Sequence, residues 1–330
     1  MKKINLIFVV LAEVLLFLIA AVVAVVVASR NRRQPAPPPD VPVAASPAEV
    51  RVKAVERKPE PTDHEVIEAS AAVAIVCGAD SATADRYEAR NDALRSIARR
   101  RDLPEKDVAA LIAYLRRADN AMRIERVAAL KNDVMNLLRS QEPPPKDLAG
   151  TLIGIFEGRK HPPAVLDYCI QHLGAMLDEL DENGRRRVRA VLVKAARKAK
   201  QPYAGTALYS LAEDARATPS QDKELKGLAL ALCKPEANHA ARIAAIQLAG
   251  ERGFADALPL LRETLSAPSR DAVLDIAAIG SIGLLGNADD IPLVESVAAR
   301  GGRRYAVAAN AAIERIKNRV ARPSEGADVR

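Results

Sequence analysis

The sequence contains few aromatic residues and no tryptophan. Phe, Trp and Tyr make up 3% of its 330 residues, whereas hydrophobic residues as a whole make up 49%. A core without large rings must be packed from Ala, Leu, Val and Ile, whose side chains suit close layers of helix on helix. The composition therefore favours a large helical core.

Cysteine is scarce as well. Cys77, Cys169 and Cys233 lie far apart in the sequence, and no C-x-x-C spacing occurs. This excludes the usual pattern of a zinc site or of a thioredoxin-like redox motif. We expect all three to be packing thiols in helices.

The motifs of common enzyme classes are also missing. There is no G-x-S-x-G, no phosphate-binding glycine loop and no Cys-His arrangement of known spacing. The four histidines do not pair at helical spacing, which argues against a metal site on one helix: His64, His161, His172 and His239. We predict no catalytic residue, no cofactor and no metal, with His172 a structural side chain.

The net charge of +7 is spread unevenly. Residues 1–40 contribute +3 of it, so +4 remains for residues 41–330. Nucleic-acid binding normally calls for a concentrated basic stripe. The overall charge therefore disfavours nucleic acid as a partner, and nothing indicates a small-molecule substrate.

A long apolar run stands at the N-terminus. Residues 4–28 are apolar except for Asn5 and Glu13, and this is long enough to cross a bilayer. The apolar stretch of a secretory signal is shorter, about 7–15 residues. We predict a single-pass membrane anchor over 1–28, although a weak cleavage site at Val26–Ser29 leaves removal open.

The flanking charges indicate the orientation only weakly. Basic residues lie on both sides of the run: Lys2 and Lys3 before it, and Arg30, Arg32 and Arg33 after it. Basic residues at the extreme N-terminus followed by one apolar run are typical of a signal anchor. We therefore expect the body to lie on the extracytoplasmic (periplasmic) side.

Proline is concentrated between the apolar run and the rest of the chain. Eight prolines fall within residues 29–62: Pro35, Pro37, Pro38, Pro39, Pro42, Pro47, Pro59 and Pro61. Proline removes backbone donors and favours extended geometry. We predict a disordered linker over 29–62; a docking peptide for a Pro-reading module is the alternative.

An internal repeat is the strongest pattern in the sequence. Residues 242–246 are followed by Gly250, Gly253, Asp256, Leu258, Pro259 and Leu260. A shift of 33 residues gives 275–279, followed by Gly283, Gly286, Asp289, Ile291, Pro292 and Leu293. Chance similarity between Ala-rich helices would not reproduce the turn residues as well.

Each repeat unit is predicted to hold two helices. Apolar residues at three- and four-residue spacing, such as Ile243 and Ile246, form the first helix. We expect a glycine with positive φ after that helix, then an Asp that caps the second helix and a Pro in its first turn. The predicted residues are Gly253, Asp256 and Pro259, and Gly286, Asp289 and Pro292.

The pattern extends along most of the chain. Residues 310–313 repeat the first helix downstream, 168–174 match 244–250 upstream, and 90–94 resemble 131–135. We predict about seven hairpins between residues 85 and 318, preceded by a capping helix over 63–77. The helical region would span 63–320, followed by a disordered tail over 321–330.

A period of 33–41 residues with two helices per unit is typical of an α-solenoid, because one hairpin cannot bury its apolar face alone. Residues 240–300 resemble bacterial HEAT-like (armadillo-like) repeats, including those named after the phycobilisome lyases. This resemblance implies an all-α, right-handed superhelix whose second helices line a concave ridge. The family consists mostly of scaffolds and adaptors, with a few enzymes, so it implies no single activity.

One predicted second helix is strongly basic. Residues 185–200 contain eight positive charges and no acid, and Val188, Val191, Leu192 and Ala195 form an apolar stripe. Such a ridge can face an acidic protein, lipid headgroups or nucleic acid, or it can be a solvated face balanced by acids at 178–182. The candidate partner-binding residues are Arg185, Arg186, Arg189, Lys194, Arg197 and Lys198.

These observations favour a membrane-tethered, non-catalytic scaffold that binds a protein partner. The alternatives are a HEAT-like lyase or hydroxylase, which needs clustered His, Glu or Cys on adjacent second helices, and nucleic-acid or anionic-surface binding through residues 185–200. HEAT-like hydroxylases carry recurring His-Glu pairs, and His64-Glu65 is the one pair in this sequence. The absence of Trp counts against a HEAT-like DNA glycosylase.

Overall fold

A computed structural model describes residues 63–267 and 271–321 of the chain. Within these ranges the protein is all-helical, with thirteen α-helices, two short 3-10 helices and no strand. The α-helices are α2 (Asp63–Val76), α3 (Tyr87–Ile97), α4 (Glu105–Arg116), α5 (Ile124–Arg139), α6 (Leu148–Gly158), α7 (Pro163–Ala175), α8 (Glu182–Ala196), α9 (Tyr203–Ala212), α10 (Pro219–Leu232), α11 (His239–Glu251), α12 (Leu258–Ser266), α13 (Ala272–Leu285) and α14 (Ile291–Ala321). The 3-10 helices are η1 (Ala255–Ala257) and η2 (Ala288–Asp290).

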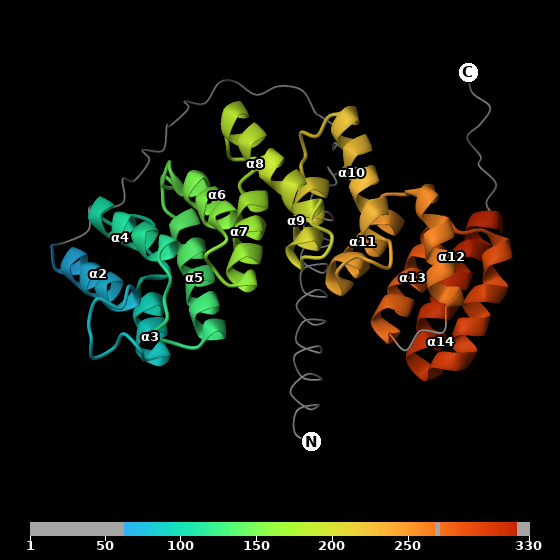
Figure 1. The fold of residues 1–330 in the computed structure, drawn as a ribbon, viewed down its shortest axis with the longest axis horizontal. Helices are drawn as coiled ribbons and strands as arrows, with labels where there is room; N and C mark the ends of the chain where they lie inside the picture. The colour runs from blue at the N-terminus through green and yellow to red at the C-terminus, as the bar shows by residue number, and fades with distance from the viewer. Residues whose placement is uncertain (1–62, 268–270, 322–330) are drawn as a thin grey trace, which may run out of the picture. The chain divides into compact units, whose positions relative to one another are not determined.

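The helices follow one another in chain order and pack in two rows (Figure 1). In one row α3, α5, α7, α9, α11 and α13 each pack against the next. The other row includes α2, α4, α6 and α8, and each of its helices also packs against the first row. The all-helical prediction is confirmed, and this packing is consistent with an α-solenoid.

The apolar positions of the repeat lie in the core as predicted. Ile246 on α11 and Ile279 on α13 are both fully buried, and the two helices pack against each other. Cys169 on α7 and Ala245 on α11, which the repeat aligns, are buried as well. The repeat units therefore place equivalent residues in equivalent surroundings.

Small residues allow close approach within the first row. A methyl group added at Gly174 would meet Ser210, at Gly250 it would meet Ser281, and at Gly283 it would lie 2.8 Å from Cα of Ala312. The Ser281 hydroxyl also donates a 2.8 Å hydrogen bond to the carbonyl oxygen of Ile246 on the neighbouring helix. Gly174, Gly250 and Gly283 are thus contact points between helices.

The two predicted turn glycines behave differently. Gly253 has a φ of +70°, as expected for the residue after α11. Gly286 has a φ of −73°, so the prediction of positive φ there is wrong. Its lack of a side chain has another cause, because a methyl group at Gly286 would lie 2.6 Å from Oδ2 of Asp290.

The predicted aspartate caps are also wrong. Asp256 lies inside η1 and forms an ion pair with Lys226, while Asp289 lies inside η2. Asn287 accepts the Asp289 N–H at 2.9 Å, and the Asp290 carboxylate accepts the Asn287 N–H at 2.9 Å. A short 3-10 turn therefore precedes α12 and α14, and the side-chain cap at Asn287 lies at the start of η2, one turn earlier than predicted.

The two ends of the described helices differ from the predicted hairpins. The helix predicted as a cap, α2, packs against both α3 and α4. The last predicted first helix, around 310–316, belongs to α14, which breaks at Gly302 (φ +73°). With α2 as the cap and α14 split there, the described helices from α3 onward make six successive pairs and one last helix, where about seven hairpins were predicted.

The predicted anchor at 4–28, the linker at 29–62 and most of the tail at 321–330 lie outside the described residues. Among the residues that are described, no helix combines the length and the apolar character needed to cross a membrane.

Candidate partner-binding surface

The basic helix predicted from the sequence is α8. Its first turn is held by Asp181, whose carboxylate accepts the Gly184 N–H at 2.7 Å, and acidic caps suit the positive end of a helix. The predicted apolar stripe is buried in the core: Val188, Val191, Leu192 and Ala195. This burial fixes which of the basic residues can face solvent.

Two of the six candidate residues belong to the interior. Arg185 and Arg189 are 5% and 7% exposed, and both bind Asp214 in the loop after α9. Nη2 of Arg185 lies 2.7 Å from each Asp214 oxygen, and Nη1 of Arg189 lies 3.1 Å from Oδ2. The expectation that both residues lie on an exposed ridge is therefore corrected, because a buried acid holds them inside.

These contacts change the pKa of the Asp214 carboxylate. Burial raises its pKa, but hydrogen bonds from Arg185 and the Arg216 N–H, with the charges of Arg185 and Arg189, outweigh burial. The net pKa of Asp214 lies below its usual value. The three side chains form a charged link between α8 and the end of α9.

Lys194 and Arg197 lie at the surface and pair with acids of neighbouring helices. The Lys194 ammonium lies 2.8 Å from Glu157 on α6, and the Arg197 guanidinium lies 3.0 Å from Glu224 on α10. Acids at 178–182 were expected to balance α8. Glu182 does lie 4.0 Å from Arg185, whereas Asp181 caps the first turn of the helix and Asp178 pairs with Arg216 at 3.8 Å.

The cations left on α8 and just after it are exposed. Arg186 is hydrogen-bonded to Asn183, whereas Arg187, Lys198 and Lys200 make no ion pair with any residue that the structure describes. We call Arg187, Lys198 and Lys200 the α8 cationic surface. Arg186, Lys194, Arg197 and Lys198 of the predicted ridge are exposed, and their role in partner binding stays a prediction.

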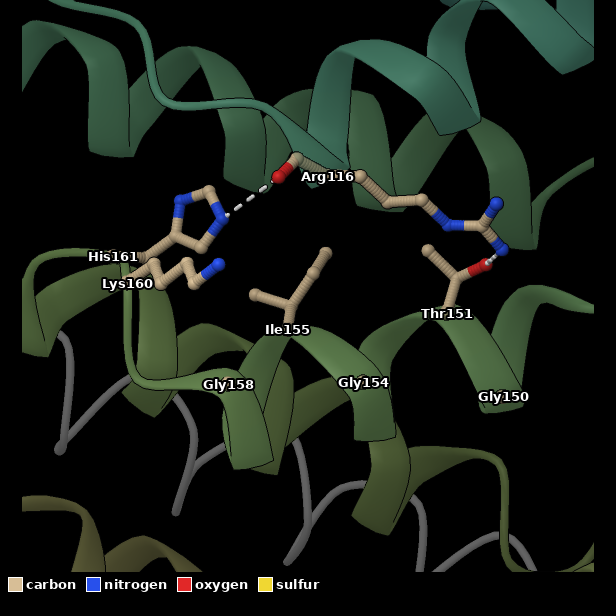
Figure 2. Close-up of a pocket in the computed structure, with 8 residues that line it drawn as sticks. All are labelled: Arg116, Gly150, Thr151, Gly154, Ile155, Gly158, Lys160 and His161. Atoms are coloured by element: carbon tan, nitrogen blue, oxygen red, sulfur yellow. Dashed lines mark hydrogen bonds between the residues drawn. The ribbon is translucent and has the colours of Figure 1, made fainter.

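A pocket that the sequence analysis missed lies between the end of α4 and α6 (Figure 2). Its volume is about 290 Å³. The residues that line it are Arg116, Gly150, Thr151, Gly154, Ile155, Gly158, Lys160 and His161. The available signal was the spacing of Gly150, Gly154 and Gly158, which places all three on one face of a helix.

The local backbone positions the basic residues of the pocket. Arg159 ends α6 in the left-handed conformation (φ 50°), and Lys160 and His161 follow it. The ring of His161 lies with Nε2 3.2 Å from the Arg116 carbonyl oxygen. Because a carbonyl oxygen can only accept, Nε2 carries the proton and Nδ1 is the acceptor.

The buried Lys131 contacts both the end of α4 and the ring of His161. Lys131 donates to the carbonyl oxygens of Leu115 (2.9 Å) and Arg117 (2.6 Å) at the end of α4, and its Nζ lies 3.4 Å from Nδ1 of His161. A cation is favourable at the negative end of a helix. Burial lowers the pKa of Lys131 to about 8, and burial together with the Lys131 charge lowers the pKa of His161.

The remaining candidate side chains lie in structural positions. Cys169 and Cys233 are buried, which raises the pKa of each thiol to about 12, and Cys77 is half-buried with its pKa raised to about 11. His172 is buried and its Nε2 lies 3.2 Å from Oδ1 of Asn132. His64 carries no described side chain, and across the two described ranges no group of His, Cys, Asp and Glu could hold a metal ion.

Comparisons of the sequence with protein-family models and curated proteins, and of the chain with solved structures, gave no match.

Proposed function

We propose that this protein is a non-catalytic scaffold of the HEAT-like kind, which binds an acidic protein partner through the α8 cationic surface. In this proposal residues 4–28 tether it to a membrane, residues 29–62 give it reach, and the units form a right-handed superhelix on the extracytoplasmic side. Support comes from the 33-residue repeat, whose equivalent residues occupy equivalent core positions.

The observation that carries the proposal is the distribution of charge on α8. Of its basic residues, two are held inside by Asp214 and two are paired with acids of α6 and α10. Arg187, Lys198 and Lys200 stay exposed without an ion pair among the described residues. Such an excess of one sign attracts a partner of the opposite sign and speeds its association.

The enzyme alternative needs reactive side chains gathered at one place. The pocket is lined by three glycines, Thr151, Ile155, two basic residues and a histidine whose ring nitrogens are both engaged. The thiols have raised pKa values, which keeps them protonated and unreactive near neutral pH. These observations favour binding over chemistry.

Crosslinking in native membranes tests the proposal. We expect the unaltered protein to crosslink to one acidic protein, and the triple variant Arg187→Glu, Lys198→Glu and Lys200→Glu to lose at least nine tenths of that product. A control with the same charge change, Arg303→Glu, Arg304→Glu and Lys317→Glu on exposed positions of α14, should keep it. Equal crosslinking by both variants, or recovery of nucleic acid in place of protein, contradicts the proposal.

The membrane tether has its own test. We expect the full-length chain to stay in the membrane pellet after carbonate extraction, because residues 4–28 are apolar enough to cross the bilayer. Release of the full-length chain would refute the tether while leaving the α8 cationic surface untouched.

A further inference from the structure

We infer that the pocket between α4 and α6 is a second binding site, which takes a short extended segment of an acidic peptide with carboxylates at its two ends. This inference rests on the proposed function, since it adds a site for the same acidic partner. The pocket and α8 flank the same helix, because Glu157 of α6 binds Lys194 of α8 (2.8 Å).

Two of the three glycines of α6 are not explained by packing. A glycine inside a helix is less favourable than an alanine. At Gly174, Gly250 and Gly283 a neighbouring helix leaves no room for a methyl group, but at Gly154 and Gly158 an added methyl group would have no atom within 4 Å. The absence of side chains at these two positions instead keeps the pocket open.

The charges of the pocket lie at its two ends. In Figure 2 the Arg116 side chain reaches toward Thr151, while Lys160 and His161 lie beside Gly158. Nη2 of Arg116 binds Asp147 (2.6 Å) and Thr151 (2.7 Å), and among the described residues its other two guanidinium nitrogens have no hydrogen-bond partner and can meet a ligand. Lys160 is exposed, and the described part of the chain provides no acid for it.

The floor between these ends is apolar. Ile155 points into the middle of the pocket (Figure 2), flanked by the glycine backbone. A nucleic acid carries a phosphate at every nucleotide, whereas this pocket has cations only at its two ends. The spacing of charges therefore favours a peptide. The distance along α6 from Gly150 to Gly158 is ~12 Å, which an extended peptide covers in about four residues.

The volume limits the enclosed part of the ligand to a short segment. About 290 Å³ lies at the lower limit of small-ligand sites, which span roughly 300–1,000 Å³. In an extended peptide, residues four apart project on the same side. The structure therefore favours glutamate or aspartate at two positions four residues apart, with small or β-branched residues between them.

The test measures fluorescence anisotropy of a labelled Glu-Val-Thr-Val-Glu peptide on the detergent-solubilised full chain. We expect saturable binding that weakens with salt, and at least tenfold weaker binding of the peptide with Gln in place of both Glu residues. Gly154→Leu should weaken binding at least tenfold because its side chain fills the pocket. Lys160→Gln should weaken it about threefold to tenfold.

Gly227→Leu is the matched control, since Gly227 lies inside α10 with no atom within 4 Å of an added methyl group. This variant makes the same exchange on another open helix face and should bind the peptide like the unaltered chain. Thermal unfolding checks that Gly154→Leu stays folded. If it does not, Gly154→Ala replaces it, with an expected loss of about threefold.

The inference fails if Gly154→Leu binds as well as Gly227→Leu, if the Gln peptide binds equally, or if a single-stranded oligonucleotide displaces the peptide at lower concentration. Failure here is distinguishable from failure of the proposed function. Crosslinking that still depends on Arg187, Lys198 and Lys200, in the absence of peptide binding, removes the pocket and keeps the scaffold. Peptide binding without any crosslinked protein would support the pocket and contradict the proposed scaffold role of the α8 cationic surface.

Discussion

Asp214 is the residue on which the largest single loss of stability is expected. Its carboxylate is fully buried and holds two buried guanidinium groups, those of Arg185 and Arg189. Asp214→Asn would take the buried counter-charge from both cations and leave Arg185 only the exposed Glu182 at 4.0 Å, so we expect the free energy of unfolding to fall by about 3–5 kcal/mol. Urea denaturation followed by circular dichroism measures the change.

The control for Asp214 removes one carboxylate charge at the surface. Glu157 pairs with Lys194, and both side chains are about half exposed (44% and 55%). Glu157→Gln should change the free energy of unfolding by no more than about 1 kcal/mol. Comparable losses for the two variants would show that burial of the pair contributes nothing.

His172 should make the stability of the protein fall in mild acid. Burial, together with the charge of Arg139, lowers the pKa of His172 to about 4, whereas an unfolded histidine titrates near 6.5. Between these values the unfolded chain binds the extra proton, so stability is lost as the pH falls from about 6.5 toward 4. The cost at pH 5 is roughly 2 kcal/mol.

The measurement compares unfolding at pH 7.5 and pH 5 for the unaltered chain and for His172→Gln. The substitution destabilises at both pH values, so the informative quantity is the difference between them. We expect a smaller pH-dependent loss in His172→Gln, while His161 titrates alike in both proteins. An identical loss in the two proteins would contradict burial of a neutral His172.

For single residues, the sequence predicted the burial of apolar side chains better than the burial of charged ones. The stripe of α8 and the inward position of Cys169 follow from helical spacing alone. The burial of Arg185 and Arg189 does not, because their partner Asp214 is 25–29 residues away and lies in a loop. A basic residue next to an apolar stripe is placed inside or outside by a distant acid that helical periodicity does not reveal.

Among the helices, arginines recur where the ends of helices need partners. Arg117 donates to the Cys77 carbonyl oxygen after α2, Arg216 to that of Leu177 after α7, Arg252 to that of Ala212 at the end of α9, and Arg319 to that of Gly286 after α13. Each pair is 33–40 residues apart. A cation satisfies the last carbonyls and the negative end of the helix dipole, so neighbouring units cap one another.

Gly283 on α13 should tolerate no side chain. A methyl group there would lie 2.8 Å from Cα of Ala312, which is backbone and cannot turn aside. We expect Gly283→Ala to lower the free energy of unfolding by about 1–3 kcal/mol. Gly227→Ala, on the open face of α10, should instead raise it by about 0.5–1 kcal/mol, as measured by urea denaturation.

The same glycines show what the repeat pattern could and could not reveal. The 33-residue repeat identified Gly250, Gly253, Gly283 and Gly286 as shared positions, yet only Gly253 needs positive φ. Gly250 and Gly283 are needed because a neighbouring helix packs closely against each of them. A repeated glycine in the sequence shows that glycine is required, but it does not show whether turn geometry or close packing requires it.

For the molecule as a whole, the pattern of contacts is linear. The main contacts join helices no more than two places apart in chain order, such as α11 with α13 or α6 with α8. The repeat predicted this arrangement, because units that resemble one another in sequence must present matching faces. The pocket escaped prediction since it depends on how α4 and α6 meet.

An array of helices that contact only near neighbours in chain order should respond locally to damage. In such a protein stability is close to a sum over units and their interfaces, so a defect loosens its own unit and the adjacent ones. We expect hydrogen exchange in Gly283→Ala to accelerate in α13 and α14, less in α11 and α12, and not at all in α2 to α6. The reason is that α13 packs against α11, α12 and α14, whereas α2 to α6 have no main contact with it. Exchange that rises equally from α2 to α14 would mean that the helices unfold as one cooperative unit, and the effect of any partner bound at α8 would then reach every helix.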